Sequence, residues 1–207
     1  MHNIDNSGKI SKRRGEIIMR RVVLASGSPR RRELLMLSEI PFTNASAQID
    51  EDLDLSLSIT EAIEKLAYEK AESVFNKFPD EFIIGADTLV ICDGKVLGKP
   101  KDNDDAIATL KLLSGKTHQV ITGVALVANG IKECFHEITE VTFLDLDEAD
   151  ILKYVKSKEP QDKAGSYAIQ GKGMLFVEKI NGDYYNVVGL PMAKLFVHLK
   201  KYLEIDY

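Results

Sequence analysis

The feature of this sequence that most constrains its fold is a set of strand-like runs bounded by two-residue turn signals. Residues 82–91, 120–128 and 133–143 are rich in apolar and β-branched side chains. Asp93-Gly94 follows the first run and Asn129-Gly130 separates the other two, and both dipeptides suit the tight turn of a β-hairpin. The sequence therefore predicts long antiparallel strands in the middle of the chain.

Shorter elements surround these strands. The apolar run 22–25 leads into Ser26-Gly27-Ser28 and predicts a buried strand that enters a tight loop. Residues 177–180 and 184–188 are expected to form a third hairpin about Asn181-Gly182. Apolar spacing and capping signals predict helices over 29–37, 58–76, 102–113 and 147–155, and from Pro191 onward. Helices interspersed with hairpins indicate an α/β fold around a mixed, strongly twisted sheet flanked by helices.

The composition limits the classes of protein to which the chain can belong. With 207 residues, 44% of them hydrophobic, it can bury a sizeable core. The formal net charge of −5 argues against bulk binding to nucleic acid. No apolar run approaches the roughly 18 residues that a membrane span requires. Cys92 and Cys134 lie far apart without metal-ligand spacing, which favours reduced thiols. We therefore expect a cytoplasmic protein with neither a nucleic-acid nor a membrane partner.

The N-terminal segment differs from the rest of the chain. Residues 1–20 carry several Lys and Arg but lack the apolar core and small-residue cleavage site of a secretory signal. We interpret them as a basic N-terminal extension. Residues 21–207 are expected to form a single domain, either compact or with two lobes around a central cleft.

The loop after the first predicted strand has the features of a phosphate site. Ser26 and Ser28 offer hydroxyls, and a helix starting at Pro29 directs its N-terminal N–H groups into the same space. Arg30 and Arg31 add guanidinium groups, which bind phosphate through charged hydrogen bonds. The same residues also fit a capped helix followed by a solvated run of arginines, so the local pattern leaves both interpretations open.

Two carboxylates are candidates for metal binding or proton transfer. Asp87 interrupts an otherwise apolar strand, where an unpaired charge is costly. It would hold a divalent ion or take a proton from an attacking water, unless it merely points to solvent at a strand end. Glu51, within the acidic run 50–52, offers the oxygen ligands that Mg²⁺ prefers, although acidic loops are usually ordinary surface.

A polar, glycine-containing segment and scattered lysines complete the candidates. Residues 162–171 are too polar for a plain core segment, and Gln170 within them has an amide suited to reading a base edge, although a glutamine is more often simply exposed. Lys70, Lys99 and Lys163 either counter phosphate charge or are solvated. Three histidines lack metal-ligand spacing, and we expect structural or surface roles for them: His118, His136 and His198.

Six motifs occur in the order and rough spacing of one protein family. They are SGSPRRRELL at 26–35, GADT at 85–88, GKP at 98–100, LSGKTH at 113–118, DKAG at 162–165 and YAIQG at 167–171. With these motifs the chain resembles the Maf proteins from about Arg21 to Leu203. Several motifs in register are far more specific than any one of them, so the resemblance favours the functional interpretation of each candidate. One departure is Ser166, where an alanine is expected.

The resemblance implies a fold and an activity. The fold would be like that of the inosine triphosphate pyrophosphatases. The activity would be the hydrolysis of dTTP and UTP between the α and β phosphates to the monophosphate and pyrophosphate, preventing incorporation of modified nucleotides. The family is also associated with arrest of septum formation, and a homodimer is the assembly that the resemblance suggests.

The resemblance also implies roles for individual residues. The aspartate matching Asp87 is taken as the proton acceptor in the family, and Glu51 would join it around one or two Mg²⁺ or Mn²⁺ ions. The positions matching Arg30, Thr88 and Gln170 mark the subgroup that prefers dTTP and UTP. The remaining matched positions would bind the phosphates: Ser26, Ser28, Arg31, Lys70 and Lys99.

Two alternatives stay open beside this interpretation. One is a housekeeping pyrophosphatase for other modified nucleotides, with dTTP and UTP as surrogates. The other is a nucleotide-sensing division regulator with little turnover. The carboxylates near Asp87 favour an enzyme, because a sensor does not need a base beside a metal.

Overall fold

The computed structural model describes residues 21–54 and 56–205, so the predicted extension 1–20 lies outside the described part of the chain. The strands are β1 (Val22–Ala25), β2 (Phe42–Asn44), β3 (Phe82–Cys92), β4 (Lys95–Leu97), β5 (Thr117–Ala128), β6 (Ile131–Phe143) and β7 (Val177–Asn181). The α-helices are α1 (Pro29–Leu37), α2 (Ile59–Phe75), α3 (Asn103–Leu113), α4 (Glu148–Lys156), α5 (Tyr184–Val188) and α6 (Met192–Leu199). Short 3₁₀ turns occupy Glu159–Asp162 (η1), Ala164–Ser166 (η2) and Lys172–Phe176 (η3).

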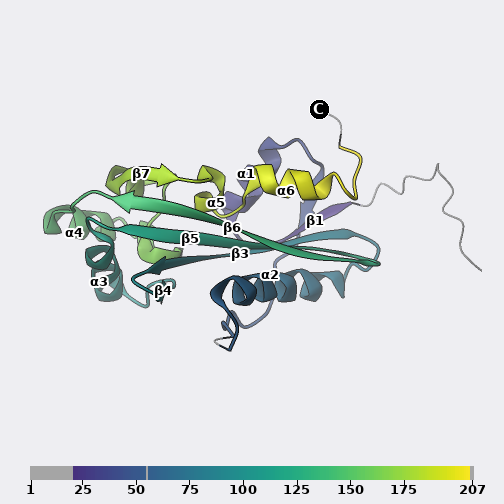
Figure 1. The fold of residues 1–207 in the computed structure, drawn as a ribbon, viewed down its shortest axis with the longest axis horizontal. Helices are drawn as coiled ribbons and strands as arrows, with labels where there is room; N and C mark the ends of the chain where they lie inside the picture. The colour runs from purple at the N-terminus through teal and green to yellow at the C-terminus, as the bar shows by residue number, and fades with distance from the viewer. Residues whose placement is uncertain (1–20, 55, 206–207) are drawn as a thin grey trace, which may run out of the picture.

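Within the described residues these seven strands form one sheet in the order β2-β1-β3-β5-β6-β7, with β4 paired to the end of β3 (Figure 1). Strand β1 runs parallel to β2 and β3, and the other pairs are antiparallel. The predicted mixed sheet is confirmed. The parallel strands are joined by crossovers, whereas β5 and β6 are joined directly by the predicted turn at Asn129-Gly130.

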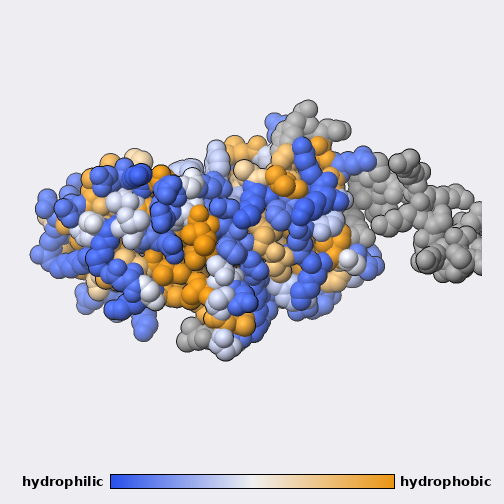
Figure 2. All heavy atoms as spheres, viewed as in Figure 1, coloured by the Kyte–Doolittle hydropathy of each residue, from blue (hydrophilic) through white to orange (hydrophobic). Residues whose placement is uncertain are grey.

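Helices cover both faces of the sheet. Helix α2 packs against β3 and β5 on one face, while α1, α5 and α6 lie over the other (Figure 1). The larger core lies on the α1 and α6 side and includes Leu24, Ile84, Val124 and Leu195, each fully buried. The face drawn in Figure 2 is largely hydrophilic, with hydrophobic residues gathered near the middle of the sheet. None of the helices in the described residues has the length and apolar character to cross a membrane.

Helix α2 forms where the sequence predicts it. Ser58 accepts a hydrogen bond from the backbone N–H of Glu61, and the Glu61 carboxylate accepts one from the Ser58 backbone N–H in return. This capping box satisfies two of the N–H groups that a helix start leaves unpaired. The buried side of the helix includes Ile63, Ala67 and Ala71, which face the sheet.

Two glycines let α2 approach the sheet closely. A Cβ atom at Gly85 in β3 would lie 2.3 Å from the carbonyl oxygen of Ala67 in the helix. A Cβ atom at Gly123, in the neighbouring strand β5, would lie 2.5 Å from the carbonyl oxygen of Ile63. Only glycine fits at either position, and the close contact seats Lys70 of α2 directly over Asp87 of β3.

The predicted third hairpin is wrong in its second strand. Residues 184–188 form helix α5 instead of pairing with β7. The Asp183 side chain accepts a hydrogen bond from the Tyr185 backbone N–H and caps the start of the helix. Gly189, with a φ of +123°, ends it. These end signals outweigh the strand preference of the Tyr and Val side chains, because a short segment follows its tertiary contacts more than its propensity.

Candidate active site

A cavity lies beside the end of the parallel strand β1. It has a volume of about 430 Å³ and is lined by the loop after β1, by β3, and by the segments around Gln161–Gln170 and Val187–Gly189. On its β1 side, β3 is paired with β1 up to Gly85 and with β4 from Val90. Residues 86–89 are therefore open on that edge, and the cavity forms in this gap. Ligands of α/β proteins commonly bind at the carboxyl ends of parallel strands.

The loop after β1 presents hydroxyl and backbone donors to the cavity. Ser26 is almost fully buried, and its Oγ accepts a hydrogen bond of 3.1 Å from the Ser28 backbone N–H. Ser28 caps α1 by accepting a hydrogen bond of 3.4 Å from the backbone N–H of Arg31. Pro29 occupies the first helical turn, where its missing N–H costs nothing. The positive end of the α1 dipole consequently faces the cavity.

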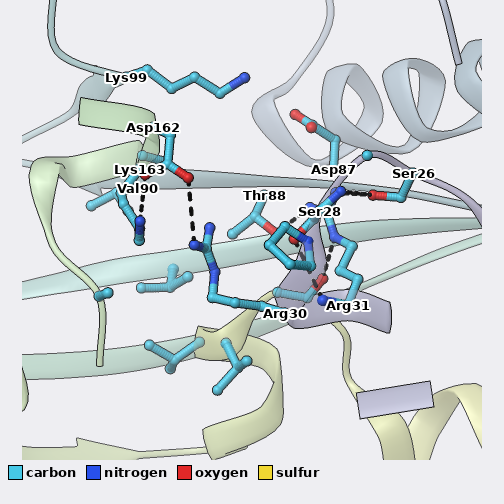
Figure 3. Close-up of a pocket in the computed structure, with 18 of the residues that line it drawn as sticks. Ser26, Ser28, Arg30, Arg31, Asp87, Thr88, Val90, Lys99, Asp162 and Lys163 are labelled. Atoms are coloured by element: carbon cyan, nitrogen blue, oxygen red, sulfur yellow. Dashed lines mark hydrogen bonds and ion pairs between the residues drawn. The ribbon is translucent and has the colours of Figure 1, made fainter. Parts of the chain in front are cut away.

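Arg31 is a buried cation held by neutral oxygen atoms. Its Nε donates to the Gly189 carbonyl oxygen at 2.7 Å, and its Nη atoms donate to Ser26 Oγ at 3.3 Å and Thr88 Oγ1 at 2.8 Å (Figure 3). Burial lowers the pKa of Arg31, and the more distant Asp87 opposes this shift. No ion pair of Arg31 is found among the described residues. A buried positive charge without a direct ion-pair partner is the complement of an anionic ligand.

Two carboxylates meet at one lysine. Lys70 Nζ lies 2.7 Å from Glu51 Oε1 and 2.6 Å from Asp87 Oδ1, and Lys70 is only 6% exposed. Lys99 Nζ lies 2.8 Å from the other Glu51 oxygen. Partial burial raises the pKa of Glu51, but hydrogen bonds from Lys70 and Lys99 outweigh it and lower that pKa to about 2. Glu51 is therefore ionised at neutral pH, with cations on both of its oxygens.

Arg30 extends toward the opposite wall. Its Nη1 lies 3.8 Å from Asp162 Oδ2, and Asp162 also pairs with Lys163 (Figure 3). Partial burial raises the pKa of Asp162, but the hydrogen bond from Lys163 and the charge of Arg30 produce a net lowering. Arg30 and Lys163 thus place positive charge at the cavity wall while their carboxylate partner stays ionised.

Hydrogen bonds to Tyr154 and Glu159 fix the segment that carries Gln170. The Tyr154 hydroxyl donates to Glu159 Oε1 at 2.9 Å and accepts from the Ala168 backbone N–H at 3.0 Å. Glu159 also accepts hydrogen bonds from the backbone N–H groups of Lys172 and Gly173. A Cβ at Gly171 would lie 2.2 Å from Glu159 Oε1, so the loop follows this carboxylate closely. Gln170 itself is exposed and lines the cavity.

The family follows from comparison with known proteins. The family model described as "Maf-like protein" matches residues 21–202. The chain belongs to the Maf family.

Two similar relatives of this Maf chain carry the same name. A protein of Bacillus cereus named "dTTP/UTP pyrophosphatase" is 50% identical over 188 residues, which are 91% of this chain and 98% of that protein. A protein of Bacillus velezensis with the same name is 50% identical over 183 residues, covering 88% and 97%. The solved structure of the Staphylococcus aureus Ham1 protein covers 88% of this chain and 99% of its own, with a TM-score of 0.51 at 14% identity. That similarity concerns the fold alone.

The structure brings all the residues that the Maf resemblance singled out to this cavity. Its lining includes Ser26, Ser28, Arg30, Arg31, Glu51, Lys70, Asp87, Thr88, Lys99 and Gln170. Asp50 and Asp52, which flank Glu51, are not among the lining residues. His118 is buried and bonds to the Tyr167 hydroxyl, while His136 and His198 pair with Glu64 and Glu133.

Sequence reasoning missed four polar residues around the Maf cavity. Tyr154 and Glu159 support the Gln170 segment, and Thr122 and Asn186 support Thr88 and the turn at Gly189. Tyr154, Thr122 and Asn186 lie in elements that the sequence marks only by their apolar pattern, and Glu159 begins a short polar 3₁₀ turn. No local signal distinguishes any of them from a surface polar residue. Their partners are far away in sequence, and only the fold shows them.

The carboxylates can accommodate a divalent cation. A single ammonium group contacts both Glu51 and Asp87, so their oxygens already converge on one cationic position. The described residues contain no group of three or more His, Cys, Asp or Glu side chains arranged for a metal ion. Two carboxylates still fit Mg²⁺, which in nucleotide enzymes is commonly held by one or two carboxylates together with substrate phosphates and water.

Proposed function

We propose that this protein is a nucleoside triphosphate pyrophosphatase that hydrolyses dTTP and UTP to the monophosphate and pyrophosphate. The observation that carries the proposal is the buried guanidinium of Arg31, which has no ion-pair partner among the described residues, in the same cavity as the Lys70-bridged carboxylates. The first group suits an anionic ligand, and the second suits proton transfer and cation binding. The name shared by relatives at 50% identity supports the choice of dTTP and UTP.

The triphosphate binds between the start of α1 and the carboxylates. Arg31, Ser26 and Ser28 contact its oxygens from one side, with the N-terminal N–H groups of α1. Lys99 and Lys70 contact the triphosphate from the opposite side. To do so, each lysine exchanges a present carboxylate contact, with Glu51 or Asp87, for a phosphate oxygen. The cavity volume of about 430 Å³ falls within the range of about 300–1,000 Å³ typical of small-molecule sites.

Asp87 acts as the general base. Its Oδ1 is bound by Lys70, and no hydrogen bond to its Oδ2 is found within the described residues, so that oxygen is available to a water molecule. The water loses a proton to Asp87 as its oxygen attacks the α-phosphorus. The bond to the bridging oxygen breaks, and pyrophosphate leaves with its charge offset by Arg30, Arg31 and Lys99.

Glu51 and Asp87 would hold a Mg²⁺ or Mn²⁺ ion in the working enzyme, as part of the same proposal. When bound, the ion supplies Lewis-acid stabilisation of the phosphate charge. The side chain of Lys70 then exchanges its carboxylate partners for a phosphate oxygen, which keeps the local charge balanced. Residues 21–207 form the pyrophosphatase domain in this proposal.

The substitution Asp87→Asn tests the assignment of the base. The amide keeps the size of the side chain but cannot accept a proton, so kcat for dTTP should fall at least about a hundredfold, the low end of what a general base contributes. The measurement is pyrophosphate release from dTTP and UTP with Mg²⁺ or Mn²⁺, compared with a panel of other natural and modified nucleoside triphosphates.

Asp93→Asn is the matched control. Asp93 follows β3 at the exposed hairpin turn, where it pairs with Lys116 outside the cavity, and its substitution should leave kcat within about twofold. If Asp87→Asn turns over as fast as the wild type, Asp87 is not the base. If wild-type protein leaves dTTP and UTP intact while consuming another nucleotide, the substrate is different, and if it binds nucleotide but consumes none, it is a sensor.

A further inference from the structure

A chain of buried hydrogen bonds runs from the cavity into the sheet. It links Thr88 of β3 to Thr122, its cross-strand partner in β5, and Thr122 to the backbone of Asn186 in α5. Thr122 and Asn186 are both fully buried. Thr88 is half-buried and lines the cavity, so the chain ends at a group that a ligand can contact.

The protons in this chain have a single consistent arrangement. Thr122 Oγ1 lies 3.0 Å from the Asn186 carbonyl oxygen, which can only accept, so the Thr122 hydroxyl proton points to that carbonyl. Thr88 Oγ1 lies 2.9 Å from Thr122 Oγ1. Because the one proton of Thr122 is already used, Thr88 is the donor in this pair. Arg31 Nη2 also donates to Thr88 Oγ1 at 2.8 Å.

The Asn186 side chain anchors the far end. Its Nδ2 donates to the Val120 carbonyl oxygen at 3.0 Å and to Thr139 Oγ1 at 2.9 Å. Thr139 in turn donates to the Asp183 carbonyl oxygen and accepts from the Asp183 N–H. These contacts fix α5 against β5 and β6, and with it the carbonyl group that receives the Thr122 proton.

In this arrangement the Thr88 hydroxyl can only accept a further hydrogen bond and cannot donate one. Its proton goes to Thr122 and one of its two lone pairs accepts from Arg31, so only the second lone pair is free. Ionised phosphate oxygens carry no proton and cannot bind there. The partner of Thr88 in a nucleotide must be a donor in the nucleoside half: a ring N–H or a sugar hydroxyl.

The surroundings of Thr88 suit a base. Val90 follows two residues later in β3 and so lies on the same face of the sheet, where it is paired with Val120 of β5, and both line the cavity. Asp87 precedes Thr88 and so projects from the opposite face, toward Lys70. Apolar side chains beside an acceptor match a flat ring that presents an N–H group at its edge.

We propose that Thr122 and Asn186 are positioning residues that make Thr88 an obligate acceptor, and that this acceptor selects uracil or thymine, whose ring N3 carries a proton, over cytosine, whose N3 does not. The proposal rests on the pyrophosphatase function proposed above and deepens it. The selectivity comes from Thr122 and the backbone of Asn186, neither of which lies among the residues that line the cavity.

The test is Thr122→Val, measured with dTTP and dCTP. Valine has nearly the same shape but cannot accept the Thr88 proton, so the Thr88 hydroxyl becomes free to rotate and donate to the N3 of cytosine. The Asn186 carbonyl keeps the N–H of Gly189 at 3.0 Å, so the variant retains a partner at this position. The ratio of kcat/KM for dTTP over dCTP should fall about tenfold, which is the effect of ~1.4 kcal/mol. Where dCTP is not turned over, its inhibition constant against dTTP should fall by the same factor.

Two further variants make the result specific. Thr122→Ser retains the hydroxyl and should restore the wild-type ratio. Thr117→Val removes one hydroxyl from an exposed Thr–Thr pair, Thr117 of β5 with Thr142 of β6, and it should leave the ratio unchanged. If Thr122→Val fails to fold, Thr88→Val serves instead, because it removes the acceptor while leaving the Thr122–Asn186 bond in place and should also lower the ratio.

The other outcomes overturn the proposal in identifiable ways. An unchanged dTTP to dCTP ratio in folded Thr122→Val shows that Thr88 does not read the ring. If the variant instead alters the preference for dTTP over 2′,3′-dideoxy-TTP, the donor is the sugar hydroxyl and the base assignment is wrong. If wild-type protein releases no pyrophosphate from dTTP or UTP, the proposed function fails first, and this is visible before any variant is made.

Discussion

Arg31 donates three hydrogen bonds to uncharged oxygens and forms no ion pair among the described residues. A structural arginine at this depth is normally paired, because an isolated buried charge is expensive. Its present partners fix the guanidinium plane and connect three segments: the loop after β1, strand β3 and the turn at Gly189. In the proposed function, the negative charge that pairs with Arg31 arrives with the ligand. The buried, unpaired guanidinium is therefore what an anion-binding site would require.

Arg31→Lys tests this interpretation. Lysine keeps the charge but is a flexible point charge that cannot donate to three fixed acceptors at once. We expect kcat/KM for dTTP to fall about 10- to 100-fold, corresponding to ~1.5–3 kcal/mol of lost hydrogen bonds to a charged group. Steady-state kinetics give the result, with the neighbouring exposed Arg32→Lys as the control, which should change kcat/KM less than twofold. Equal effects of the two substitutions would show that only the overall charge of α1 matters.

At the residue scale, the local motifs could nominate site residues but could not show how they are connected. The motif around Arg31 predicts a phosphate site, since serines, a helix start and arginines occur together. Nothing in it predicts that Arg31 bonds to Gly189, because that contact spans 158 positions. The roles of Thr122 and Asn186 cannot be predicted from the sequence for the same reason. A buried polar residue is identified by its hydrogen-bond partners, and the partners of these two residues lie in other elements.

Helix α2 connects the fold to the chemistry, because its distance from the sheet sets the position of Lys70. Gly85 and Gly123 lie on adjacent strands beneath the helix, two residues apart in the register, and neither position leaves room for a methyl group. Lys70 sits on the same buried side of α2 as Ala67 and Ala71. A helix pushed outward would carry its ammonium group away from Asp87 and Glu51.

Gly85→Ala should therefore affect both stability and activity. The added methyl would lie within 3 Å of the backbone of α2, which must shift, so the free energy of unfolding should fall by about 1–3 kcal/mol, as for other overpacked cores. Urea denaturation measures this change, and kcat should fall with it. The control is Gly98→Ala, where nothing lies within 4 Å of the new atom, and its unfolding free energy should hardly change. A fully stable Gly85→Ala would mean that α2 can move without cost.

At the element scale, the sequence predicts what is locally encoded. The capping box at Ser58 and the turn at Asn129-Gly130 are self-contained signals, and both elements form as expected. The strand prediction for residues 184–188 is wrong because it considered only the strand-like side chains. The Asp183 cap and the helix-ending Gly189 favour a helix instead. The segment is short enough for its ends and its anchoring by Asn186 to decide its structure.

The order of the strands is a property of the whole molecule, and composition and periodicity do not contain it. β1 lies between β2 and β3, and β3 lies beside β5. The short β4, which comes between β3 and β5 in the sequence, pairs only with the end of β3. Hydrophobic alternation determines which face of each strand is buried, but the choice of neighbour depends on contacts between distant segments. The fold was predicted instead by the resemblance to a known family, and the position of the cavity follows from that fold.

We expect His118 to make the stability of the whole molecule depend on pH. It is 1% exposed, its Nε2 pairs with the Tyr167 hydroxyl at 2.9 Å, and its Nδ1 is buried without a partner among the described residues. Burial lowers the pKa of His118 from 6.5 to about 4. As pH falls through about 6.5, His118 becomes protonated in the unfolded chain, whereas in the folded protein it stays neutral until about pH 4. The free energy of unfolding should therefore fall across this window.

The loss attributable to His118 should reach about 3 kcal/mol at pH 4, because a tenfold difference in proton affinity between the folded and unfolded states corresponds to ~1.4 kcal/mol. His118→Gln replaces the ring by an amide that does not titrate, so the variant should lose less stability than wild type between pH 7 and pH 4, even if it is less stable at pH 7. Denaturant unfolding at several pH values gives the two slopes, and other titrating groups cancel in their difference. Parallel slopes would mean that His118 becomes protonated inside the folded protein as readily as in the unfolded chain.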